Sequence, residues 1–156
     1  MSGIYLCGKI QIIMNIPEKI IIHCSATMAG KDFSAADIDR WHRARGFRKI
    51  GYHYVVRLDG RYERGRADHE EGAHCPQQSM NRRSISICYV GGLDSAGRPA
   101  DTRTPAQKRT ILTLIHTLRS RYGHLPVCGH RDIPGVAKAC PCFDAIREYD
   151  SPRPRK

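Results

Sequence analysis

The sequence lacks any long apolar run, and no stretch approaches the roughly 20 residues that a membrane-spanning helix needs. The first 19 residues are moderately apolar, but Lys9 interrupts them. They also lack the basic start and the small-residue cleavage site that are typical of a secretion signal. We therefore expect neither a membrane span nor a signal peptide, and we expect the chain to accumulate in the cytoplasm.

The sequence also lacks a regular disulfide framework, internal repeats and a clear linker. Its seven cysteines are an odd number without regular spacing, which favours free thiols in a reducing compartment. A length of 156 residues favours one domain with a single core. We expect this domain over residues 19–149, between an N-terminal extension (1–18) and a basic tail (150–156). Met14 could serve as a start by itself, so we expect the residues before it to be dispensable for the fold.

Acidic residues are few, because 15 Asp and Glu stand against 26 Lys and Arg, which gives a net charge of +11. Such a charge favours an anionic partner, and nucleic acid, a membrane surface and an anionic cell envelope all meet this condition. The charge alone does not choose among them.

Five segments have the patterns of β-strands. They cover residues 19–24, 52–58, 61–66, 84–89 and 127–128. A hairpin turn at Asp59 and Gly60 joins the second segment to the third. Alternation within the second segment places four side chains on one side of the strand, namely Tyr52, Tyr54, Val56 and Leu58.

Two capping boxes mark the starts of helices. Ser34 with Asp37 begins the first helix, and Thr104 with Gln107 begins the second. A short third helix is expected over residues 143–149. The order strand, helix, hairpin, strand, helix, strand, helix predicts an α/β fold, in which a single domain has a mixed central β-sheet flanked by helices.

Two histidines, His23 and His130, stand at the ends of predicted strands, where functional sites are common. Cys140 lies ten residues beyond His130, on a loop that can fold back. Two imidazoles and a thiolate are good zinc ligands, and a fourth position left open is typical of a catalytic zinc. Spacing alone leaves two alternatives: ordinary surface or core histidines, and a closed structural site that also uses Cys142.

Six motifs follow one another along the chain: IIIHCSAT, WHRARGF, GYHYVVRLDG, SISICYVGG, TPAQ and GHRDIPGVAKACPCFD. Together they resemble the zinc-dependent N-acetylmuramoyl-L-alanine amidases of the phage-lysozyme type, which share a fold with the peptidoglycan recognition proteins. The resemblance covers residues 19–149. It implies hydrolysis of the amide between the lactyl group of N-acetylmuramic acid and L-alanine in peptidoglycan, as in an endolysin.

The resemblance implies that Zn²⁺ is the cofactor and that His23, His130 and Cys140 are its ligands. It also implies catalytic roles for Tyr52 and Lys138. For Tyr52, the alternative interpretation is a packed strand tyrosine whose hydroxyl is satisfied within the core.

His74, in the long loop, matches a family position that lines the substrate groove. An exposed loop histidine is the alternative.

Several other residues have interpretations that involve no metal. The family has Ser or Thr where this chain has Cys142, so we interpret Cys142 as a thiol that does not bind zinc. Strand alternation points Cys24 to the face opposite His23. Cys75 is expected to be a reactive loop thiol, and Trp41 is expected to anchor the core rather than to form a sugar platform.

Two other functions remain open at this stage: a non-catalytic peptidoglycan-binding module, and an amidase that also binds a phage polymerase. The complete set of ligands favours the enzyme. We expect a monomer whose partners are peptidoglycan or muropeptides rather than nucleic acid. We expect it to act on the cell wall after release, with cytoplasmic recycling of wall fragments as the alternative.

Overall fold

The computed structural model of the protein describes residues 4–7 and 10–151. The rest of the predicted extension and tail, residues 1–3, 8–9 and 152–156, lies outside the described residues. Within the part that is described, no helix combines the length and the apolar character that crossing a membrane requires.

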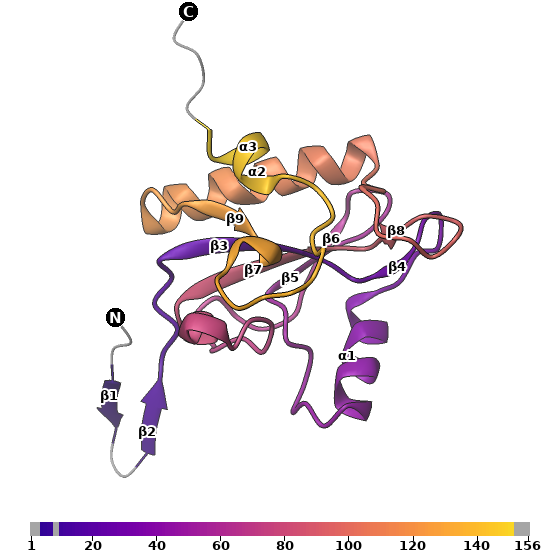
Figure 1. Cartoon of the computed structure of the whole chain (residues 1–156). Helices are drawn as coiled ribbons and strands as arrows, with labels where there is room; N and C mark the ends of the chain where they lie inside the picture. Colours follow the sequence, from indigo (N-terminus) through magenta and orange to yellow (C-terminus); the bar gives the residue numbers. More distant parts are fainter. Residues whose placement is uncertain (1–3, 8–9, 152–156) are drawn as a thin grey trace, which may run out of the picture.

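The chain that precedes the central sheet forms a hairpin and then attaches to the body of the protein. Strand β1 (Ile4–Cys7) pairs antiparallel with β2 (Ile10–Ile13) in a two-stranded sheet of its own (Figure 1). Asn15 is buried, and its side-chain amide donates to the carbonyl oxygens of Asp68 and Ser84, both at 2.9 Å. Residues directly before the central sheet are therefore part of the packed structure, whereas the dispensability of the hairpin stays a prediction.

The central sheet has five strands in the order β6-β5-β7-β3-β9. Their bounds are β3 (Lys19–Cys24), β5 (Tyr54–Val56), β6 (Tyr62–Arg64), β7 (Ser84–Tyr89) and β9 (Val127–Gly129). Strand β6 is antiparallel to its neighbour, and the other four run parallel. The expected mixed sheet is therefore confirmed. A small parallel pair, β4 (Thr27–Met28) and β8 (Gly92–Leu93), extends beyond one end of it.

Strand β5 is shorter than the predicted strand over residues 52–58. The backbone bends at His53 and turns at Leu58, so alternation holds only between these points. Tyr52 and Leu58 consequently pack in the cluster around Val55, on the face opposite the other two side chains of β5. The prediction that all four residues share one side is wrong for Tyr52 and Leu58.

Three α-helices flank the sheet, with α2 and α3 on one side and α1 on the other (Figure 1). Their bounds are α1 (Ala35–Ala44), α2 (Pro105–Tyr122) and α3 (Ala145–Tyr149). Both predicted capping boxes are present: Ser34 caps α1 and Thr104 caps α2. Two short 3₁₀ helices, η1 (Gln77–Arg82) and η2 (His130–Asp132), lie in the loops.

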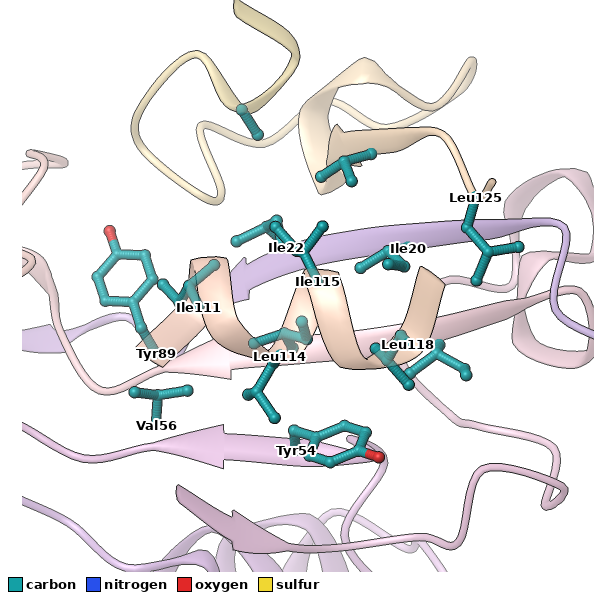
Figure 2. Packing of buried hydrophobic residues seen from close by; sticks show 14 of the residues in the cluster. Ile20, Ile22, Tyr54, Val56, Tyr89, Ile111, Leu114, Ile115, Leu118 and Leu125 are labelled. Carbon is teal, nitrogen blue, oxygen red and sulfur yellow. The ribbon is translucent and has the colours of Figure 1, made fainter. Parts of the chain in front are cut away.

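The main hydrophobic core lies between α2 and the sheet (Figure 2). Helix α2 contributes Ile111, Leu114, Ile115 and Leu118, and β3 contributes Ile20 and Ile22. Each fully buried side chain of this size stabilises the fold by about 1.5–3 kcal/mol. Alternation along β3 turns His23 away from this core, and the opposite face of the sheet is therefore the one that carries the polar groups.

Candidate functional site

Two histidines and a cysteine meet at the carboxyl edge of the central sheet. His23 is the penultimate residue of β3, His130 directly follows β9, and Cys140 lies on the loop before α3. Because β3 and β9 are parallel neighbours, their ends bring the two histidines to the same edge. One ligand atom from each residue lies within 4.8 Å of the others, and His23 Nδ1 is 3.8 Å from Cys140 Sγ.

This donor set fits a zinc ion. Ligand atoms held at about 2.0–2.3 Å in a tetrahedral arrangement lie roughly 3.5 Å apart, close to the separation between His23 Nδ1 and Cys140 Sγ. Both histidines are buried, whereas Cys140 is half-buried. All three residues line one groove, so an ion held between them would have a free position on the groove side.

Backbone hydrogen bonds hold Cys140 in place. The N–H of Cys24 donates to Cys140 Sγ at 3.3 Å, and the N–H of Arg131 donates to the carbonyl of Cys140 at 2.7 Å. The hydroxyl of Tyr89 donates to the carbonyl of Pro141 at 2.6 Å. These contacts tie the loop to both β3 and β7, so they fix the position of Cys140 Sγ beside the two histidines.

His74 contacts the ring nitrogen of His23 that is not the one near Cys140. Its Nδ1 is 2.9 Å from His23 Nε2, and only 8% of the residue is exposed. The alternative of an exposed loop histidine is therefore wrong, although His74 does form part of the groove wall. Burial, and then the neighbouring cationic forms of other histidines, hold the pKa of His23 and His74 well below the usual range. Both imidazoles are thus neutral at pH 7, which for His23 is the form that a metal binds.

Tyr52 and Lys138 border the same groove. The ring centroid of Tyr52 is 5.2 Å from that of His23. Burial raises the pKa of Tyr52 well above its usual range, so its hydroxyl keeps its proton and can donate. Lys138 is exposed on the loop that carries Cys140. The structure places both residues beside the three ligands, and their catalytic roles stay predictions.

One wall of the groove comes from α1 and the segment after it, which sequence analysis did not assign to the site. The groove has a volume of about 450 Å³, and Trp41, His42, Arg45 and Phe47 line this wall. The expectation that Trp41 anchors the core is wrong, because 37% of the residue is exposed. Ile38, one turn earlier on α1, occupies the buried position instead. The sequence signal that could have indicated this wall is a large aromatic residue, Trp41, on a helix that is otherwise half polar.

The remaining cysteines lie outside the ligand group that is found among the described residues. Cys142 Sγ is 3.9 Å from Cys24 Sγ, and both thiols pack at the main core. Burial raises the pKa of Cys142 to about 12. Cys75 is completely buried beside Ile21, so the expectation that it is a reactive loop thiol is wrong.

Comparisons with known proteins agree with this geometry. The model of the N-acetylmuramoyl-L-alanine amidase family matches residues 14–143. An endolysin of Klebsiella phage KP32 is 36% identical over 133 residues, and one of Escherichia phage T7 is 34% identical over 133 residues; each match covers 85% of both chains.

Solved structures show the same fold. The N-acetylmuramoyl-L-alanine amidase LysC from Clostridium intestinale superposes with a TM-score of 0.70 at 26% identity, over 85% of this chain and 81% of that chain. Bumblebee PGRP-SA superposes with a TM-score of 0.68 at 22% identity, over 97% of this chain and 86% of that chain. The second likeness concerns the fold alone.

Proposed function

Because this chain belongs to the N-acetylmuramoyl-L-alanine amidase family, we propose that it is a zinc-dependent amidase of bacterial cell walls. The bond that it cuts joins the lactyl group of N-acetylmuramic acid to L-alanine in peptidoglycan. The observation that carries this proposal is the meeting of His23, His130 and Cys140 in one groove. The endolysin relatives support action on the cell wall.

His23, His130 and Cys140 would hold the zinc ion, with one position facing the groove. When bound, zinc supplies a Lewis acid and an activated water at neutral pH. The three residues also exclude bulk water from the inner side of the site, because both histidines are buried.

Tyr52 and Lys138 act on the charge that develops during the reaction. Attack on the lactyl carbonyl places negative charge on its oxygen, and the ammonium of Lys138 stabilises that charge from the groove edge. The protonated hydroxyl of Tyr52 donates a hydrogen bond to the reacting group. Loss of one such donor typically lowers turnover by about 10²–10³-fold.

The groove and the net charge fit this substrate. Trp41, which is partly exposed and lines the groove, offers an apolar contact to a sugar or to the stem peptide. A net charge of +11 attracts the protein to anionic wall polymers, and this attraction weakens as salt increases.

Replacing single cysteines tests the proposal. Cys140→Ser should lose most bound zinc and most cleavage, since a hydroxyl is a poor substitute for a thiolate ligand. Cys142→Ser is the matched control, and it should keep both, because Cys142 lies at the core outside the ligand group.

Mass spectrometry of muropeptides, incubated with and without a chelator, reports the bond cut and the metal dependence together. Free stem peptide distinguishes the amidase from a module that only binds peptidoglycan. If Cys140→Ser cuts muropeptides at the wild-type rate, the proposed ligand set is wrong.

A further inference from the structure

A line of hydrogen bonds runs from His23 into the interior of the protein. His23 Nε2 is 2.9 Å from His74 Nδ1, and His74 Nε2 is 3.4 Å from Ser84 Oγ. Ser84 Oγ is in turn 2.6 Å from the carbonyl oxygen of Met80. His23, His74 and Ser84 are all buried, so water does not compete for these bonds.

The position of each hydrogen follows from the fixed end of this line. A carbonyl oxygen can only accept, so the single hydroxyl hydrogen of Ser84 points to Met80. The lone pair of Ser84 Oγ therefore faces His74, and the hydrogen of His74 lies on Nε2. A neutral imidazole carries one hydrogen, which leaves a lone pair on His74 Nδ1. His23 must then carry its hydrogen on Nε2 and donate it to His74.

This arrangement leaves the lone pair of His23 on Nδ1, the atom that lies 3.8 Å from Cys140 Sγ. A metal binds the unprotonated nitrogen of an imidazole, and the hydrogen bond of the other nitrogen decides which one that is. We infer that His74 is a positioning residue, which fixes the tautomer and the ring orientation of His23 for metal binding. The inference rests on the proposed zinc site and deepens it.

The choice of a histidine for this task has an electrostatic consequence. The partner of a metal-binding histidine is commonly a carboxylate, a backbone carbonyl or a water. A carboxylate would add a negative charge close to the ion, whereas neutral His74 adds none. His74 therefore orients His23 without lowering the net positive charge that zinc and one thiolate leave at the site.

The loop around His74 is built to hold it. The backbone N–H groups of His74 and Cys75 both donate to Asn81 Oδ1 at 2.8 Å. At Gly72 a Cβ atom would lie 2.5 Å from His74 Cδ2, so only glycine lets the chain pass the ring at this distance. The first feature fixes the backbone at His74, and the second lets the chain pack closely against its ring.

His53 provides a matched control. It is completely buried, and its ring centroid is 5.8 Å from that of His74. Its own hydrogen bonds, however, go to Ser86 and to the carbonyl of Glu70. A change at His53 therefore disturbs the same region without touching the line of bonds that ends at His23.

Nitrogen NMR of the metal-free wild-type protein tests the inference directly, because it distinguishes the two tautomers of each histidine. His23 should carry its hydrogen on Nε2, and His74 should do the same. A hydrogen on Nδ1 of His23 would overturn the inference. This measurement needs neither a variant nor an active enzyme.

Zinc affinity, measured by competition with a chromophoric chelator, tests the energetic part. His74→Leu should weaken zinc binding by about 10–100-fold, the usual effect of losing such a partner. His74→Asn should recover most of the loss, because Asn Oδ1 can accept from His23 near the place of the histidine Nδ1. His53→Gln should bind zinc within about threefold of the wild type.

Equal zinc affinity of folded His74→Leu and the wild type would refute the role, as would an equal loss in His53→Gln. If His74→Leu does not fold, Ser84→Ala replaces it. That variant frees His74 to exchange tautomers, so NMR should show His23 in both forms. Zinc binding without muropeptide cleavage by the wild type would overturn the proposed function and leave this inference standing.

Discussion

Replacing Arg103 with methionine is expected to loosen the C-terminal segment that follows Cys140. The side chain of Arg103 is 1% exposed, and its guanidinium bonds to Asp101 at 2.8 Å and to Glu148 at 2.7 Å. It also donates to the hydroxyl of Tyr149 at 2.7 Å and lies 3.3 Å from the ring centre of Phe143. One buried cation therefore joins the loop before α2 to α3.

The magnitude follows from the burial of each group. Removing one partner of a buried ion pair costs about 3–5 kcal/mol, because the other charge loses its compensation. The side chains of Asp101 and Glu148 are 32% and 37% exposed, so water recovers part of this cost. The lost cation–π contact adds about 1 kcal/mol. We expect the free energy of unfolding to decrease by about 3 kcal/mol, which corresponds to a Tm lower by about 6–12 °C.

Urea unfolding at neutral pH measures this change, and an unchanged m-value would show that the denatured state is not altered. Arg98→Met is the matched control, because the Arg98–Asp94 pair at 3.0 Å is exposed and should contribute nothing measurable. Arg103→Lys should fall between the two, since an ammonium cannot make the same forked contacts. An Arg103→Met midpoint equal to that of the control would refute the reasoning.

Three further predictions concern pH, the groove wall and the N-terminal segment. Burial lowers the pKa of His53 from 6.5 to about 4, so the unfolded chain binds a proton that the folded chain resists. His53 should therefore contribute about 3 kcal/mol to the stability that the metal-free protein loses between pH 6.5 and pH 4, and urea titrations of His53→Gln should show a loss that is smaller by about this amount. Trp41→Ala should raise KM for soluble muropeptides in steady-state assays, and a fall in kcat alone would contradict a role in substrate contact. Asn15→Ala should cost about 1–3 kcal/mol, since it removes two buried hydrogen bonds to backbone carbonyls. A chain that begins at Met14 should keep the wild-type Tm. If this truncated chain is destabilised as much as Asn15→Ala is, the hairpin contributes to the fold.

Local patterns in the sequence predicted most of the fold. The strands over 19–24 and 84–89 have the expected bounds, because continuous or alternating apolar residues on a buried sheet leave few alternatives. The helix starts were also readable, since each capping box satisfies backbone N–H groups within a few residues. Signals of this kind act over short distances along the chain.

Other features depend on contacts between distant segments. Sequence periodicity assigned Tyr52 to one face of a strand and Trp41 to the buried face of a helix. It could not show where the backbone of the strand bends, or that another residue of the helix occupies the buried position. The hydrogen bond between His74 and His23 joins residues that are 51 positions apart in the sequence. The direction of this hydrogen bond depends further on the hydroxyl of Ser84, which no sequence pattern reports.

The candidate site was predictable in part. Strand ends suggested His23 and His130, and the family resemblance chose Cys140 over its neighbour Cys142. The sequence alone did not show that β9 pairs directly with β3, which is the arrangement that brings the two histidines together.

The pairing of β3 with β9 also has a consequence for synthesis on the ribosome. At about 5–20 residues per second, the roughly 100 residues that separate the two strands take about 5–20 s to be made. During that time one edge of β3 has no partner, which makes it a point where nascent chains can aggregate. His23 and Cys140 are 117 residues apart, so the proposed metal ligands come together only when the chain is almost complete. A chain whose translation stops early therefore lacks the proposed metal site, however well its first strands have folded.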